Sequence, residues 1–289
     1  MYITKATFDI AKSLSVWYNN NMKNCFENKI HHGDILFRYA KGRSILKGNE
    51  IHPYHEILYF TDGGGKFYSE NFDTDLCKNM LFIIPKNTYH RFLISDQDAY
   101  TRLVLNFPES DTVSGVKLLS ESRASVIYPP SKDIEFILKK MRSALDGEEA
   151  SKHKLNLLYG AFLMLISELS SEDSNLPSTS LTEKHELITK CINHIEKNLS
   201  KKISIESTAK ELNVSSSTLS QVFKNQLGIS FYKYITEKRL IYAHSLIANG
   251  EAPTKIFLEC GYNDYATFYK AYLKMFGSSP SRHVASDIK

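Results

Sequence analysis

The spacing of hydrophobic and polar positions divides the chain into a first part made of short strands and a later part that is helical. Before residue 110, short apolar runs alternate with segments that contain Gly, Pro, Asn and Asp. Such runs predict β-strands separated by turns. The predicted strands cover residues 35–39, 56–60, 66–68, 80–84 and 102–107. Several short strands in succession are typical of a β-sandwich or a β-barrel.

From residue 131 the apolar positions recur at helical spacing and predict two helices, at 131–146 and 152–169. The second helix carries an apolar stripe that consists of Leu155, Leu158, Phe162, Leu165 and Leu169. This stripe can pack on the β domain of the same chain or on the same helices of a second subunit. We expect the second arrangement, and therefore a homodimer.

Residues 170–182 are polar, rich in Ser and interrupted by Pro177, which is the composition of an interdomain linker. The sequence therefore predicts an N-terminal domain at 1–170, a linker at 171–182 and a C-terminal domain at 183–289.

The C-terminal domain is expected to contain only helices, because apolar positions keep helical spacing between turns rich in Gly, Asn and Ser. The predicted helices cover residues 187–199, 205–212, 216–227, 231–248, 253–260 and 265–276. They form two units, each with a short helix, a tight turn and a longer helix. That layout is typical of a helix-turn-helix, whose second helix reads the major groove of DNA.

The second helix of each unit has a polar face opposite its apolar one. In the first unit Ser and Gln side chains can form hydrogen bonds with base edges, and Lys224 can reach a base or a phosphate. An ordinary solvated helix face is the alternative for either unit alone. The residues expected to contact DNA are Ser215, Ser216, Ser217, Ser220, Gln221, Lys224, Asn263, Tyr265, Ala266, Tyr269, Lys270 and Lys274.

The distribution of charge agrees with a DNA-binding role for the helical part. The net charge is +4, and residues 181–289 hold 15 Lys and Arg against 10 Asp and Glu. The basic excess therefore belongs to the helical part, which fits contact with a polyanion.

The apolar runs are too short to cross a bilayer, and no secretory signal is visible, so we expect a cytoplasmic protein. The four cysteines are too far apart for a metal knuckle and are expected to be buried thiols.

The C-terminal domain resembles the AraC/XylS family of transcription regulators. The matching residues are Ala209, Leu212, Val214, Ser215, Leu219, Phe223, Lys224, Gly228, Tyr234, Ile235, Arg239, Leu240, Ala243, Ile256, Gly261, Tyr262, Asp264, Phe268, Phe276, Gly277 and Pro280. The resemblance implies that both units enter adjacent major grooves of promoter DNA. It also implies a transcription regulator, with activation favoured and RNA polymerase as a partner. Gln221 and Lys270 stand where Arg is usual in the family.

The N-terminal domain contains a second constellation, Glu50, His52, Glu56 and His90. If residues 50–56 form a strand, the first three share a face and His55 points the other way. The spacing resembles the two cupin motifs, with Glu50 in place of the first His and with Asn79 and Asn87 in place of two glycines. Asn tolerates the positive φ that such positions require. The resemblance implies a cupin-like jelly roll of the kind that serves as a sensing domain in this family.

Three uses of these side chains are open: a divalent metal site, a satisfied polar core, or part of a site for an organic effector. We expect an effector site without metal, other cofactor or catalytic residues, and a protein that is not an enzyme. The effector, a small molecule such as the sugars frequent in the family, would contact Arg38, His52, Tyr54, Glu56 and His90. The alternatives are a metal-dependent cupin enzyme with a helical C-terminal domain, and a regulator whose barrel binds a protein partner.

Overall fold

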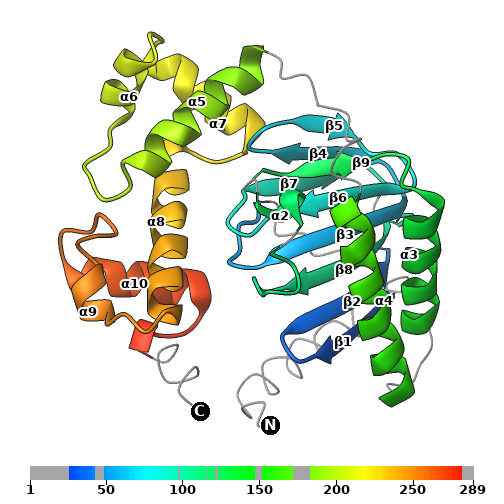
Figure 1. Ribbon diagram of the computed structural model, residues 1–289. Coiled ribbons are helices and arrows are strands. Elements are labelled where there is room, and N and C mark those ends of the chain that lie inside the picture. Colours follow the sequence, from blue (N-terminus) through cyan, green and yellow to red (C-terminus); the bar gives the residue numbers. More distant parts are fainter. Residues whose placement is uncertain are drawn as a thin grey trace.

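The protein consists of a β domain covered by a helical hairpin, followed by an all-helical domain (Figure 1). The structure is a computed structural model, and it describes residues 26–42, 49–96, 98–114, 116–120, 123–146, 152–171 and 183–281. The predicted linker lies outside these residues, apart from its first position. The predicted fold class, α+β with a sheet domain before a helical domain, is confirmed.

The β domain is built from two antiparallel sheets. The larger sheet has six strands in the order β1-β2-β8-β3-β6-β9, and the smaller has three in the order β5-β4-β7. The strands are β1 (Phe26–His32), β2 (Ile35–Lys41), β3 (His55–Asp62), β4 (Gly65–Ser69), β5 (Asp73–Asp75), β6 (Met80–Ile84), β7 (His90–Ile94), β8 (Thr101–Phe107) and β9 (Ser125–Ile127).

The larger sheet is buried on both faces, because apolar side chains of its central strands point alternately to one face and to the other. On β3, Leu58 and Phe60 join the cluster that contains Phe67 of the smaller sheet, whereas Ile57 and Tyr59 join the cluster beneath the helices. Successive side chains of a strand point to opposite faces, so a central strand covered on both sides reads as a continuous apolar run. Between β8 and β9 lies the short helix α2 (Lys117–Ser120).

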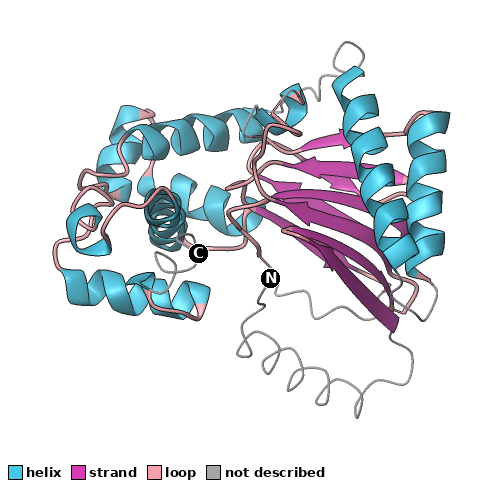
Figure 2. Ribbon diagram, turned by 60° about the horizontal axis from the view of Figure 1, so that its bottom comes forward, coloured by secondary structure: helices cyan, strands magenta, loops and turns pink. Residues whose placement is uncertain are grey.

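Two antiparallel helices, α3 (Lys132–Leu145) and α4 (Lys152–Ser171), cover the outer face of the larger sheet (Figure 2). The apolar stripe of α4 faces inward. Leu158, Phe162, Leu165 and Leu169 are at most 2% exposed, and they belong to the same cluster as the apolar side of α3 and the sheet. The stripe is therefore part of the core of its own chain, and it does not supply the dimer contact that we expected of it.

The helical domain contains six helices in the described residues. They are α5 (Glu183–Lys197), α6 (Ile205–Glu211), α7 (Ser216–Gln226), α8 (Phe231–Ala248), α9 (Pro253–Ile256) and α10 (Tyr265–Phe276). Side chains of Ser215, Ser230 and Asp264 accept hydrogen bonds from backbone N–H groups in the first turns of α7, α8 and α10. Such caps satisfy donors that have no partner inside the helix.

None of the helices in the described part of the chain has the length and apolar character that spanning a bilayer requires. Cys191 and Cys260 are buried thiols as expected, but Cys77 is exposed because it lies in the turn between β5 and β6.

Candidate functional site

The first helix-turn-helix is formed by α6 and α7, and Asn213 makes the turn between them with a φ of 53°. Leu219 and Phe223 of α7 are fully buried, while Ser217, Ser220, Gln221 and Lys224 are exposed. The polar face of α7 is thus exposed to solvent, while the end of the helix contacts the β domain, where Arg91 donates to the carbonyl of Asn225 at 2.8 Å. Ser215 uses its hydroxyl to cap the helix, accepting from the N–H of Thr218 at 3.0 Å.

The second unit ends in α10, and Gly261 (φ 77°) makes the turn before it. Ala266, Lys270 and Lys274 are exposed, as is Asn263 in the turn. Tyr265 and Tyr269 are half-buried, and the Tyr265 ring lies 5.9 Å from that of Phe268 in the core of this unit. Part of the Tyr265 side chain is therefore used in packing within this unit.

Glu50, His52, Glu56 and His90 come together in the interior of the β domain. One ligand atom of each lies within 4.8 Å of the corresponding atoms of the other three. His52, Glu56 and His90 are 6%, 4% and 1% exposed, so these three side chains are shielded from water, while Glu50 is half-buried. The backbones of Glu50 and His90 exchange two hydrogen bonds, of 2.9 and 3.0 Å, which ties the two segments together.

The local backbone differs from the continuous strand expected over residues 50–56. Strand β3 begins only at His55, and residues 51–54 form a bend through Pro53. His55 does point away from the group, toward Glu109, whose Oε2 lies 3.0 Å from its Nε2. Asn79 and Asn87 have positive φ angles of 68° and 64°, as their positions in the cupin-like motif required.

The carboxylate of Glu56 controls the electrostatics of this group. Burial alone would lower the pKa of His52, but the hydrogen bond and the negative charge of Glu56 outweigh it and raise that pKa above its ordinary value. Burial would raise the pKa of Glu56, but His52, His90 and Arg38 together lower it to about 2. The pKa of His90 is lowered, first by burial and then by the neighbouring His52. Glu56 is therefore an anion at neutral pH.

The space beside this group is too small for an organic effector. Its volume is about 10 Å³, and its walls include Arg38, Glu56 and His90. A cavity of this size holds about one water molecule or ion. The residues that the sequence suggested for effector binding thus do not line one open cavity, because Tyr54 lies outside this interior space.

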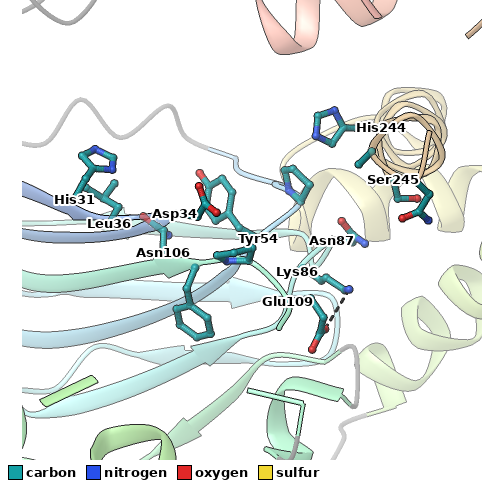
Figure 3. A pocket seen from close by; sticks show the side chains of 15 residues that line it. His31, Asp34, Leu36, Tyr54, Lys86, Asn87, Asn106, Glu109, His244 and Ser245 are labelled. Carbon is teal, nitrogen blue, oxygen red and sulfur yellow. Dashed lines mark ion pairs between the residues drawn. The ribbon is translucent and has the colours of Figure 1, made fainter. Parts of the chain in front are cut away.

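Tyr54 instead forms part of the floor of a much larger pocket (Figure 3). Its ring stacks on that of His52, with centroids 4.0 Å apart, and the residue is 37% exposed. The pocket has a volume of about 650 Å³. It is lined by His31, Asp34, Leu36, Pro53, Tyr54, Lys86, Asn87, Asn106, Phe107, Pro108, Glu109, His244, Ser245, Ala248 and Asn249. Its size is within the usual range for sites that bind small molecules.

One wall of the pocket belongs to the helical domain. His244 and Ser245 lie in the last turns of α8, the helix that connects the two helix-turn-helix units. The Nδ1 atom of His244 is 2.8 Å from the hydroxyl of Tyr272 in α10. A molecule in the pocket would therefore contact the β domain and also a residue joined to the second recognition helix. No local sequence signal marks α8 as part of a ligand pocket.

A buried ion pair joins the two domains in the first half of α8. Glu70, in the turn between β4 and β5, accepts hydrogen bonds from the backbone N–H of Tyr89 at 3.0 Å and the hydroxyl of Tyr234 at 2.9 Å. Its Oε1 also lies 3.0 Å from Nζ of Lys238, whose side chain is 6% exposed. Lys238 donates further hydrogen bonds to the carbonyl of Asn87 and to Glu196, both at 2.8 Å. Burial would lower the pKa of Lys238, but Glu70 and Glu196 raise it, so the ammonium stays charged.

A β domain with a pocket of ligand size, packed on two helix-turn-helix units, defines a DNA-binding transcription regulator with a ligand-binding domain. The sequence comparisons agree. Residues 32–166 match the family described as AraC-like ligand binding domain, and residues 208–285 match the family described as helix-turn-helix domain. The chain belongs to the AraC family of transcription regulators. The prediction made from the sequence is thereby confirmed.

Three relatives are similar over most of their length. The probable transcriptional regulator LumQ of Photobacterium leiognathi is 25% identical over 236 residues, 80% of this chain and 90% of that protein. The raffinose operon transcriptional regulatory protein RafR of Pediococcus pentosaceus is 25% identical over 268 residues, 88% of this chain and 94% of that protein. The HTH-type transcriptional activator RhaR of Escherichia coli K12 is 27% identical over 253 residues, 84% of each chain.

Proposed function

We propose that this regulator responds to a small molecule bound in the pocket between the β domain and α8. The observation that carries the proposal is the composition of the pocket wall, since a cavity of about 650 Å³ is lined by residues of both domains. A ligand that contacts both walls stabilises the arrangement in which they face each other. Tyr54 links this pocket to the expected effector residues, because it stacks on His52.

The lining favours an uncharged, hydroxyl-rich ligand, and we propose a carbohydrate. Tyr54 offers an aromatic face, while Asn87 and Asn106 offer amides that both donate and accept hydrogen bonds. The ammonium of Lys86 is 3.1 Å from the carboxylate of Glu109, so this charge is already balanced (Figure 3). One relative is named for the raffinose operon, which supports the same ligand class.

Helix α8 is the element through which the ligand acts. Its first half is held by the ion pair of Lys238 with Glu70, and its last turns form a wall of the pocket. The helix has 18 residues, or about 27 Å at about 1.5 Å per residue. Filling the pocket therefore fixes the end of α8 that carries the second helix-turn-helix unit. Two units held in a fixed relation bind two successive major grooves better than two units that move independently.

The DNA-facing residues in this proposal are those exposed on α7 and α10, with Gln221 and Lys270 at their centres. The regulator works in the cytoplasm on promoter DNA and contacts RNA polymerase. Activation is the favoured outcome, and the name of the relative RhaR, a transcriptional activator, supports it.

The functional form is proposed to be a homodimer that uses the outward face of α4. On this face Leu157, Leu163 and Met164 are 39%, 38% and 56% exposed. Gly160 lies between them, and a Cβ atom built there meets nothing within 4 Å. A flat apolar helix face with a glycine at its centre suits the close approach of a second helix, and a symmetric dimer brings the same face of another chain to it.

The carbohydrate proposal predicts that Tyr54→Ala lowers the affinity for a bound sugar about tenfold or more, because the stacking face and a hydrogen-bonding group are both lost. Raffinose is the first probe, followed by a panel of mono- and disaccharides, with calorimetry on the full chain. Tyr128→Ala is the matched control, because Tyr128 is 52% exposed and lies outside the pocket. A sugar bound equally well by the Tyr54 variant would place the site elsewhere. Binding of none of the probes would contradict the ligand class but not the DNA-binding function.

The DNA-binding proposal predicts two distinct responses. Gln221→Ala is expected to relax discrimination at particular base pairs, at a cost of about 1–3 kcal/mol for the preferred base. Lys274→Ala, if the ammonium contacts a phosphate, is expected to weaken binding to all sequences about equally and to reduce the salt dependence by about one ion. Binding of a randomised site library at two salt concentrations measures both. The same response from both variants would contradict the assigned roles.

A further inference from the structure

We propose that the ligand is an oligosaccharide whose far end lies in a second, smaller pocket on the other face of the β1–β2 hairpin. This inference rests on the proposed carbohydrate site between the β domain and α8, here called the interdomain pocket, and it specifies the length of the ligand. The smaller pocket has a volume of about 270 Å³. Separate sites for small molecules usually have about 300–1,000 Å³, so this space suits one part of a ligand better than a whole one.

The smaller pocket, here called the side pocket, shares three residues with the interdomain pocket. Asp34, Phe107 and Pro108 line both. Asp34 lies in the turn of the hairpin, and Phe107 is the last residue of β8. The two pockets therefore meet where the hairpin turn and the end of β8 form their common border.

Away from this border the two pockets use opposite faces of the hairpin. His31 and Leu36, which are paired across β1 and β2, line the interdomain pocket (Figure 3). The next pair, His32 and Ile35, lines the side pocket. This division follows from the alternation of side chains along a strand. A ligand that occupies both pockets passes around the tip of the hairpin, and it does so beside Asp34.

The hairpin turn holds a carboxylate at the border of the two pockets. Gly33 has a φ of 58°, as the first central residue of a two-residue type II′ turn requires, and Asp34 takes the second central position. Asp34 is exposed, and among the described residues its carboxylate has neither a hydrogen bond nor an ion pair. An ionised carboxylate only accepts hydrogen bonds, and its two oxygens can accept from two adjacent hydroxyl groups. The border thus favours a neutral polyhydroxylated ligand and disfavours an acid.

The walls of the side pocket repeat the chemistry of the interdomain pocket. The ring of His32 stacks on that of Tyr159 in α4, with centroids 4.4 Å apart and planes 12° apart. Ser110 and Thr112, both exposed, add hydroxyl groups that donate and accept. Within the described part of the chain no Lys or Arg lines this pocket. An aromatic surface beside neutral hydrogen-bonding groups suits a second sugar ring, as Tyr54 beside two amides suits the first.

The test measures binding of galactose, melibiose and raffinose to the full chain by calorimetry, because these sugars share galactose and contain one, two and three rings. We expect raffinose to bind about tenfold or more tightly than galactose, since only the longer ligand reaches the side pocket. His32→Ala removes one ring of the aromatic pair and is expected to abolish this gain, while galactose binds as before. Asp34→Asn keeps the shape of the side chain and should weaken raffinose binding about tenfold, because it removes a charged acceptor.

His153→Ala is the matched control, because His153 is exposed on α4 and lines neither pocket. It should bind all three sugars as the wild type does. If His32→Ala does not fold, Thr112→Val decides, since it changes an exposed side chain little in shape and should weaken raffinose binding about threefold.

Two kinds of failure are distinguishable. Equal affinities for the three sugars, or His32→Ala and Thr112→Val variants that bind raffinose as the wild type does, would overturn the role of the side pocket and leave the interdomain site intact. If none of the three sugars binds, the carbohydrate class itself is wrong, and the proposed role of the side pocket is wrong with it. If galactose binds equally well to Tyr54→Ala, the first ring lies outside the interdomain pocket, which also overturns the arrangement.

Discussion

Replacing Lys238 by Met is expected to separate the two domains while each remains folded. Glu70 is 6% exposed, and without the ammonium the donors to its carboxylate among the described residues are Tyr89 and Tyr234. Removing one partner of a buried ion pair costs about 3–5 kcal/mol, because the remaining charge stays desolvated. That cost applies only while the β domain and the helical domain are in contact, because separation of the two domains exposes Glu70 to water. The expected result is therefore loss of docking, with independent motion of the first helix-turn-helix.

Urea unfolding of the full chain, followed by signals from each domain, measures this effect. We expect one shared transition to split into two. Lys233→Met is the control, because Lys233 lies on the same helix, and its 56% exposed side chain makes only a 3.8 Å pair with Glu237. Exposed pairs of this kind are worth about 0–1 kcal/mol. Adding Glu70→Gln to Lys238→Met should recover part of the loss, because no unpaired charge then remains. A Lys238 variant that unfolds like the Lys233 variant would show that the ion pair does not hold the domains together.

The sequence predicted two helices of the helical domain with their bounds because their signals are local, whereas α5 begins four residues before its predicted start and α9 ends four residues before its predicted end. The observed bounds of α8 and α10, Phe231–Ala248 and Tyr265–Phe276, coincide with the predicted ones. Ser230 and Asp264 cap these helices through contacts within one turn, so neighbouring residues alone determine where each helix begins.

The sequence prediction missed four strands, β1, β5, β7 and β9, and two of them, β1 and β5, have no comparable signal. Strand β1, with the sequence FENKIHH, lies at the edge of the larger sheet and buries only Ile30 fully. Strand β5 has three residues, all polar. An edge strand needs no apolar alternation, because its partner strand supplies the pairing and solvent covers one side. The central strands β3, β6 and β8 are buried on both faces, and the sequence shows them plainly.

The candidate sites, like the strands, were predicted only where a local sequence pattern marks them. Glu56 and His90 were predicted to converge because the cupin-like motifs fix their spacing, and the structure brings them together. The ion pair of Glu70 and Lys238 and the pocket wall at Ser245 were not predicted. Each joins residues more than 130 positions apart through the packing of one domain on the other, which no pattern within either segment records.

Substitutions in helix α4 test whether its apolar stripe packs within its own chain. Two neighbouring leucines are expected to differ, since one substitution should lower the stability of the β domain and the other should not. Leu158 is fully buried against α3 and the sheet, whereas Leu157 is 39% exposed. Leu158→Glu places a carboxylate in the core, where it has no partner, and is expected to unfold the β domain. Its loss of stability should exceed about 3 kcal/mol, measured by thermal or urea unfolding.

The double variant Leu157→Glu with Met164→Glu changes only the outward face, so we expect the melting temperature to stay close to that of the wild type. If this face joins two chains, the four added carboxylates of a dimer repel one another across the interface, and sedimentation should show monomers. Binding to a promoter with two sites should then lose the gain that comes from linking two DNA-binding domains, about a hundredfold or more. A double variant that sediments as a dimer would exclude this face as the contact. A wild-type protein that sediments as a monomer at micromolar concentration would exclude the dimer itself.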